Sequence, residues 1–122
     1  MTTLPIAGSC AVDAPVGGSA VEVPALDVGL LRLLGDPLRA QIVGLLAAEQ
    51  LCTCHLAALT GAGQSNVSNH LRALRKAGLV QQEPSSRFTY YRLDPDVLEA
   101  LGGALIGLAE AARSAPDRRR PC

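Results

Sequence analysis

Apolar residues recur at helical spacing between residues 27 and 78. Leucines at positions 30, 31, 33 and 34 predict a first helix that starts at Asp27, and "GDP" at 35–37 ends it. Asp36 can cap a second helix, whose apolar positions continue to Leu46. The same spacing predicts two further helices, one over roughly residues 52–59 and one from residue 64 or 65 to Gly78.

The fourth predicted helix is amphipathic. Its apolar positions Val67, Leu71 and Leu74 are spaced four and three residues apart, which gives one buried stripe. The remaining face carries polar and cationic side chains, namely Asn66, Asn69, Arg72, Arg75 and Lys76. The turn "TGAG" at 60–63 separates this helix from the short helix before it. A short helix, a glycine-containing turn and an amphipathic helix together predict a helix-turn-helix.

After Gly78 the pattern changes from helical to strand-like. "LVQQE" and "RFTYYRL" read as two strands, and "PSSR" at 84–87 forms the turn of a hairpin. A last helix begins at Asp94 and Pro95, with small residues around an apolar stripe formed by Val97, Leu98, Leu101, Leu105 and Leu108. Small residues allow close helix–helix approach, which suits a dimer interface. The predicted fold is therefore mostly α with a β-hairpin wing, a winged helix-turn-helix.

The chain of 122 residues has the length of one domain. Prolines and glycines interrupt residues 1–25, which we expect to form a flexible arm carrying Cys10; residues 26–112 form the domain and 113–122 a disordered tail. The N-terminus lacks the features of a secretory signal, and no apolar run approaches the roughly 20 residues of a membrane span. We therefore expect a cytoplasmic protein without a membrane partner, in which cysteines stay reduced.

Charge is distributed unevenly along a neutral chain. Eleven basic residues balance eleven acidic ones, which argues against nonspecific binding of nucleic acids. Residues 64–92 are locally basic, because five arginines and lysines there face only Glu83 as an acidic residue. A specific nucleic-acid contact, if present, is expected in this segment.

Three segments resemble one family of proteins. "LGDPLRAQIVGLL", "QSNVSNHLRALRKAGLV" and "RFTYYRL" resemble the ArsR/SmtB family of bacterial metal-sensing repressors, and "LCTCHL" is similar to its arsenic-sensing branch. The resemblance covers roughly residues 26–110. It implies a homodimer built on the first and last helices, which binds an inverted repeat in an operator. It also implies that an inducer releases the DNA, so that resistance genes are transcribed.

The resemblance places DNA contacts on the fourth helix and the wing. A recognition helix needs short polar groups to reach base edges and cations to hold phosphates. The candidates are Gln64, Ser65, Asn66, Ser68, Asn69, His70, Arg72 and Arg75 on the helix, with Arg87 and Tyr90 in the hairpin. The alternative is a solvated helix face with Ser65 as a simple cap and Arg87 as a solvated turn residue.

The thiols are the candidate metal ligands. Thiolates select soft ions, and trivalent arsenic or antimony favours three sulfurs, whereas zinc takes four donors. On a regular helix Cys52 and Cys54 differ in direction by about 200°, so a shared ion requires a distorted helix start. Arsenic sensors with this motif often have a third cysteine three residues further on, where this chain has Ala57. We expect Cys10 to replace it, from the other subunit of the dimer in preference to its own, and we expect no role for Cys122.

Pulling Cys52 and Cys54 towards Cys10 would shift the first helix of the helix-turn-helix, and the recognition helices would no longer match two major grooves.

Other roles for the cysteines remain open. They can be small buried hydrophobic residues, ligands for cadmium, lead or zinc with His55 as a borderline donor, or redox-sensing thiols. An enzyme is not expected, because the motif is C-x-C rather than C-x-x-C and no acid–base constellation accompanies it.

Overall fold

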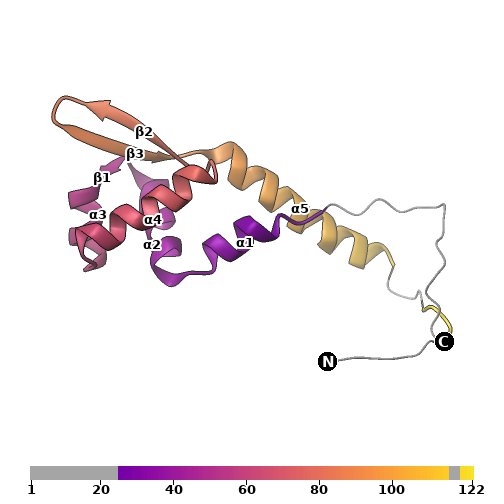
Figure 1. Ribbon diagram of the computed structural model, residues 1–122. Helices are drawn as coiled ribbons and strands as arrows, with labels where there is room; N and C mark the ends of the chain where they lie inside the picture. The colour runs from indigo at the N-terminus through magenta and orange to yellow at the C-terminus, as the bar shows by residue number, and fades with distance from the viewer. Residues whose placement is uncertain (1–24, 116–118) are drawn as a thin grey trace. The chain divides into compact units, whose positions relative to one another are not determined.

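The computed structural model describes residues 25–115 and 119–122. Residues Leu26–Gly103 form one compact unit, and the described residues from 104 onward belong to a second. The elements follow in the order α1 (Val28–Leu34), α2 (Pro37–Ala48), β1 (Leu51–Cys52), α3 (Thr53–Thr60), α4 (Gln64–Lys76), β2 (Val80–Ser85), β3 (Phe88–Leu93) and α5 (Pro95–Ser114) (Figure 1). Cys10 and the predicted N-terminal arm lie outside the described residues.

Aspartates set the starts of the first two helices. The Asp27 carboxylate accepts a hydrogen bond from the Leu30 N–H at 3.0 Å. The Asp36 carboxylate accepts from the N–H groups of Leu38 and Arg39 at 2.9 and 3.1 Å, with Pro37 in the first turn. These bonds satisfy donors that the helix itself cannot pair. The predicted break at "GDP" and the cap by Asp36 are confirmed.

The core of the first unit draws on every predicted helix and on the sheet. The apolar stripe of α4 is fully buried: Val67, Leu71 and Leu74 expose 1% of their surface or less. Leu30, Leu33 and Leu34 of α1, and Val97 and Leu98 from the start of α5, pack against this core. The remaining buried members of the cluster are Ile42, Leu46, Leu51, Leu56, Leu79 and Val80.

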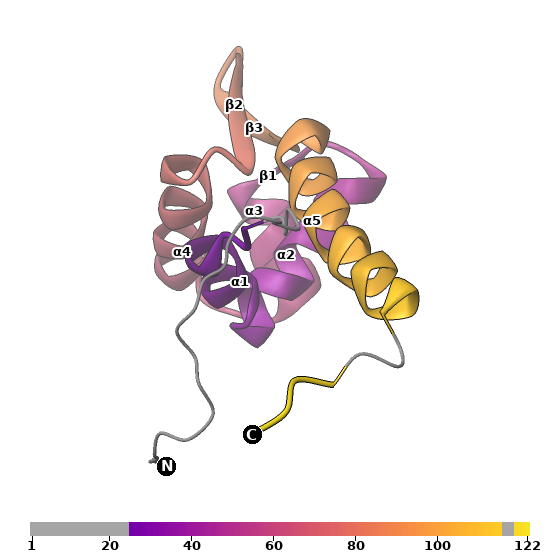
Figure 2. The same ribbon diagram turned by 90° about the vertical axis from the view of Figure 1, so that its right-hand side faces the viewer.

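The hairpin is part of a three-stranded sheet rather than a separate two-stranded wing. The strands lie in the order β1-β3-β2, and both pairs are antiparallel. Strands β2 and β3 pair from Val80–Leu93 to Ser85–Phe88, and the turn at Ser86 and Arg87 uses a positive φ of 55° at Ser86. The tip of this hairpin projects beyond the helices of the unit (Figures 1 and 2).

Strand β1 corrects the predicted start of the third helix. Cys52 has an extended backbone, with φ −92° and ψ 173°, and pairs with Tyr90 of β3, while Leu51 pairs with Tyr91. The helix therefore begins at Thr53 rather than at Cys52. The reason is tertiary: ladder pairing with β3 holds Cys52 in the extended conformation.

The last helix, α5, continues to Ser114. It therefore extends into residues 113–122, which were expected to form the tail. Leu101 is buried, whereas Leu105 and Ile106 are 44% and 61% exposed. In the described part of the chain, no helix is long and apolar enough to cross a membrane.

Candidate functional site

Helices α3 and α4 form the helix-turn-helix. Gly61 ends α3 in the left-handed region, with φ 79°, and its N–H donates to the Ala57 carbonyl at 2.9 Å. A residue with a Cβ is strained at this φ, so glycine suits the turn. Gly63 is the N-cap of α4, and no side chain caps this end. Ser65 therefore lies inside the helix and is not its cap, and its side chain is exposed.

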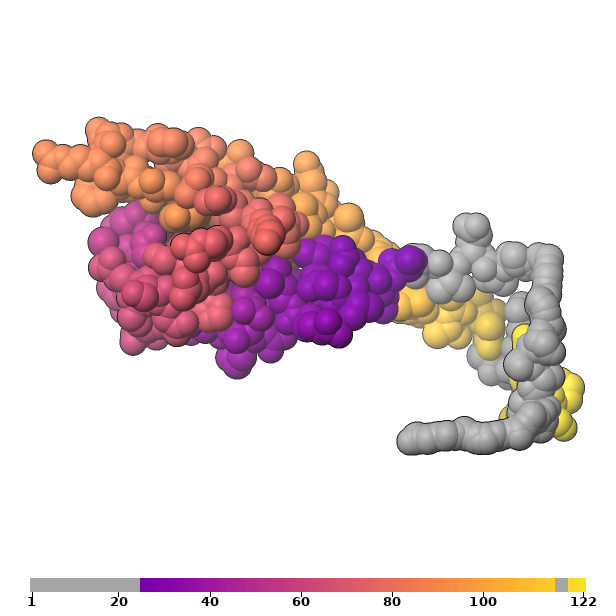
Figure 3. Space-filling model, viewed as in Figure 1, coloured from indigo at the N-terminus to yellow at the C-terminus, as the bar shows by residue number. Residues whose placement is uncertain are grey.

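The polar face of α4 collects the predicted DNA-contacting side chains on one element. Gln64, Ser65, Asn66, Asn69, Arg72 and Arg75 are exposed, and Ser68 and His70 are half-buried. Arg72 donates from Nη1 to the Asn69 Oδ1 at 3.0 Å. Figure 3 shows α4 and the hairpin on the surface of the same unit. The arrangement presents short polar groups along the helix and cations towards its end.

His70 has a partner that the sequence analysis missed. The Arg39 Nη1 lies 3.0 Å from the His70 Nδ1, and the Arg39 Nε donates to the Leu33 carbonyl at 2.7 Å. The Asp36 carboxyl lies beside this group. The pKa of Asp36 is lowered, mainly because its carboxylate accepts a hydrogen bond from the backbone N–H of Arg39. Charge attraction from Arg39 and His70 and the hydrogen bond from the Leu38 N–H lower it further, whereas burial acts in the opposite direction. No sequence signal links Arg39 to His70, which lies 31 residues away.

The wing residues separate into two environments. Arg87 is exposed in the turn. Arg92 instead donates from Nε to the Glu83 Oε2 at 2.6 Å across the two strands. Tyr90, the other DNA-contact candidate in the hairpin, is half-buried, and its ring centroid lies 6.1 Å from that of His55. Tyr90 therefore lies beside α3.

Both described cysteines of the C-x-C pair line one hollow of about 230 Å³. Cys52 is buried and Cys54 is exposed. The remaining lining comes from Thr53 and from the wing, through Arg87, Phe88, Thr89 and Tyr91. The two thiols thus share a space with the turn and second strand of the hairpin. Because Cys52 precedes the helix, the geometry of two positions on a regular helix does not apply to the pair.

Two polar side chains contact these thiols. The His55 Nδ1 accepts from the Cys52 N–H at 3.3 Å and lies 3.4 Å from the Cys52 Sγ. The Gln64 Nε2 donates to the Cys54 Sγ at 3.6 Å, which links the thiol to the first residue of α4. His55, considered above as a borderline metal donor, accepts from the N–H of the N-cap residue Cys52 and therefore caps the start of α3.

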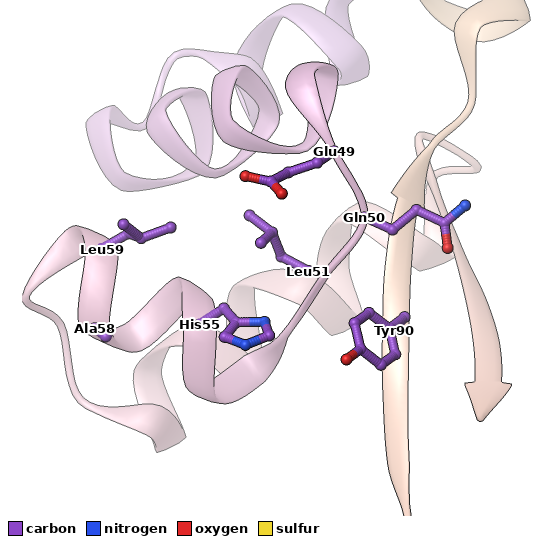
Figure 4. Close-up of a pocket in the computed structure, with 7 residues that line it drawn as sticks. All are labelled: Glu49, Gln50, Leu51, His55, Ala58, Leu59 and Tyr90. Carbon is purple, nitrogen blue, oxygen red and sulfur yellow. The ribbon is translucent and has the colours of Figure 1, made fainter. Parts of the chain in front are cut away.

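A second hollow, of about 530 Å³, is lined by His55 and Tyr90 together with residues of α3 and of the chain leading into β1 (Figure 4). Its lining is mainly apolar, and Figure 4 shows Leu51 and Leu59 extending into the space between α3 and the chain that leads into β1. Within the described residues, no group of three or more His, Cys, Asp or Glu side chains could hold a metal ion. The predicted third thiol, Cys10, is outside those residues.

The fold and the polar helix define a class of protein. A short helix, a glycine turn, a polar-faced helix and a hairpin with an exposed arginine make a winged helix-turn-helix, a DNA-binding module. Residues 36–82 match the family described as "Bacterial regulatory protein, arsR family". The arsenic resistance transcriptional regulator ArsR1 of Pseudomonas putida is 33% identical over 113 residues, which cover 90% of this chain and 88% of that protein. The chain therefore belongs to the arsR family of transcriptional repressors.

Solved structures agree with this assignment. A crystal structure of a possible transcriptional regulator for arsenical resistance has a TM-score of 0.60 at 36% identity, covering 73% of this chain and 95% of that chain. The solution structure of the homodimeric winged helix-turn-helix domain of Mb0332 from Mycobacterium bovis has a TM-score of 0.56 at 26% identity, covering 77% of this chain and 86% of that chain. The predicted fold class is confirmed.

Proposed function

We propose that this repressor senses trivalent arsenic or antimony through Cys52, Cys54 and Cys10, and that binding releases it from operator DNA. Release would allow transcription of resistance genes. The observation that carries the proposal is the position of Cys52 and Cys54, which line one hollow together with the wing.

The operator contacts are assigned to α4 and the wing tip. The exposed amides and hydroxyls near the start of α4 suit base edges in the major groove, since Asn and Gln can pair bidentately with adenine. Arg72, Arg75 and the exposed Arg87 suit phosphates. We expect the target to be an inverted repeat, because a two-fold symmetric dimer presents two recognition helices.

The thiol chemistry supports a soft metalloid. When arsenite binds, each thiol forms an As–S bond and its proton leaves with a displaced hydroxide as water. Cys52 and Cys54 supply two sulfurs, and three would complete the preferred set. Cys10 is proposed as the third, because among the described residues no third cysteine lines the hollow with the pair.

The contacts around the thiols suggest how binding reaches the DNA interface. The backbone of Cys52 pairs with Tyr90 of β3, three residues after Arg87 at the wing tip. Cys54 accepts a hydrogen bond from Gln64 at the start of α4. A metalloid that draws these sulfurs together would strain both the wing ladder and the link to α4. A coupling free energy of roughly 1–3 kcal/mol would weaken DNA binding about 5- to 150-fold.

The proposed homodimer rests on exposed apolar residues of the first and last helices. Val28 on α1 is 57% exposed, and Leu105 and Ile106 on α5 are also exposed. Apolar residues left on helix surfaces favour a partner. A homodimer is also the state named for the Mb0332 domain.

The test is fluorescence anisotropy of the reduced protein on labelled DNA from its own promoter region. Arsenite, zinc and cadmium are titrated in parallel. Release by near-stoichiometric arsenite, with little effect of zinc, is the expected result. Release by cadmium or zinc alone would reject the arsenic assignment while keeping the repressor, and no DNA binding under any condition would reject the operator function itself.

A further inference from the structure

Arg39 joins three helices through one guanidinium group. It lies in the first turn of α2, donates from Nε to the Leu33 carbonyl in α1, and places Nη1 3.0 Å from Nδ1 of His70 in α4. We propose that Arg39 is a positioning residue, which fixes α4 against α1 and α2 and presents His70 to operator DNA. This inference rests on the DNA interface of the proposed function.

The Arg39–His70 contact determines which side of the imidazole can reach DNA. Arginine carries only hydrogen-bond donors, so the guanidinium donates and the His70 Nδ1 accepts. The proton of the neutral ring therefore lies on Nε2, at the opposite edge. His70 is half-buried at the border of the α4 apolar stripe, one helical turn after Asn66. Its Nε2–H is then the donor available to a phosphate oxygen or a base acceptor.

The hydrogen bond from the Arg39 Nε to the Leu33 carbonyl anchors the guanidinium group to α1. Because Nε is held by the Leu33 carbonyl at 2.7 Å, the guanidinium cannot follow α4 if that helix turns about its axis. The Asp36 carboxylate, which accepts from the Arg39 N–H, fixes the backbone from which the side chain extends. Functional groups need such supporting contacts to keep a productive orientation. Arg39 thereby connects α1, a proposed dimer helix, to the proposed recognition helix.

A positioning role for Arg39 can be distinguished experimentally from direct contact between Arg39 and a DNA phosphate. A direct ligand would release counterions, and removing it from both subunits would make the slope of log affinity against log salt shallower by about 1.8. A positioning residue leaves that slope unchanged. It also acts through His70, so its loss should have little further effect once His70 is gone.

The experiment measures operator affinity of the full chain across a range of salt concentrations. The variants are Arg39→Gln, His70→Ala and the double variant. Arg32→Gln is the matched control, because Arg32 is exposed on α1 and carries the same charge. Circular dichroism and sedimentation check folding and assembly. If Arg39→Gln does not fold, Arg39→Lys replaces it, since lysine keeps the charge but lacks the planar guanidinium group that bonds to both Leu33 and His70.

We expect each single variant to lose roughly 5- to 150-fold in affinity, equivalent to one hydrogen bond in each of two subunits, with an unchanged salt slope. The double variant should be no weaker than the weaker single variant, and Arg32→Gln should bind like the wild type. Additive losses, or a shallower slope for Arg39→Gln, would overturn the positioning role while leaving the repressor intact. Failure of the wild-type chain to bind operator DNA would instead overturn the proposed function, and this inference with it.

Discussion

Arg87 offers a quantitative test of the proposed DNA interface. It is exposed at the hairpin turn, and replacing it with Gln removes one cation from each wing of the proposed dimer. If each guanidinium neutralises one phosphate, two contacts are lost and the slope of log affinity against log salt becomes shallower by about 1.8. Between roughly 50 and 200 mM salt, a fourfold change, the affinity advantage of the wild type over Arg87→Gln should shrink by about 12-fold.

The assay is anisotropy with the operator at several salt concentrations. Arg92→Gln is the matched control in the same hairpin, because Arg92 already pairs with Glu83 at 2.6 Å and both groups are partly exposed. Its removal should change the slope little, since exposed pairs contribute weakly and a paired cation is less available to a phosphate. Equal slopes for Arg87→Gln and the wild type would refute the wing-tip phosphate contact.

Two further predictions concern stability. Leu71→Ala removes a side chain that is 1% exposed, so the free energy of unfolding in denaturant should fall by about 2–5 kcal/mol. The control Leu59→Ala, at a residue that is 53% exposed, should lower it much less. Equal losses for the two variants would contradict the assigned core. The lowered pKa of Asp36 means that its ionised form stabilises the fold above the unfolded value of 3.8 and that this contribution disappears as pH falls through the folded value. The stability difference between wild type and Asp36→Asn should therefore shrink on acidification below that range, and a difference independent of pH would contradict the assignment.

The helices could be predicted from the sequence because each carries its own signal. Asp27 and Asp36 are caps that precede apolar runs, and the stripe of α4 has a clear helical period. Strand β1 could not be predicted. Two residues, Leu51 and Cys52, carry no period, and their conformation is set by pairing with β3, about 40 residues further along the chain.

The candidate site divides in the same way. The polar face of α4 follows from residue spacing, because all its members lie on one helix. The shared hollow of the two thiols and the wing depends on the β1–β3 pairing, so spacing alone cannot reveal it. The contact between Arg39 and His70 likewise depends on the packing of α2 against α4. From the sequence, the thiols could therefore be selected only as candidate ligands, with a proposed route to DNA through α4 alone.

The most direct test of the account is arsenite-induced release measured on matched cysteine variants. The double variant Cys52→Ser/Cys54→Ser is compared with Cys122→Ser, which removes a thiol outside the proposed site, in reducing buffer on the same operator fragment. We expect both proteins to bind DNA. Arsenite should release Cys122→Ser as it releases the wild type, whereas the double variant should stay bound. Normal release of the double variant by arsenite would contradict the assignment of Cys52 and Cys54 as the sensing thiols.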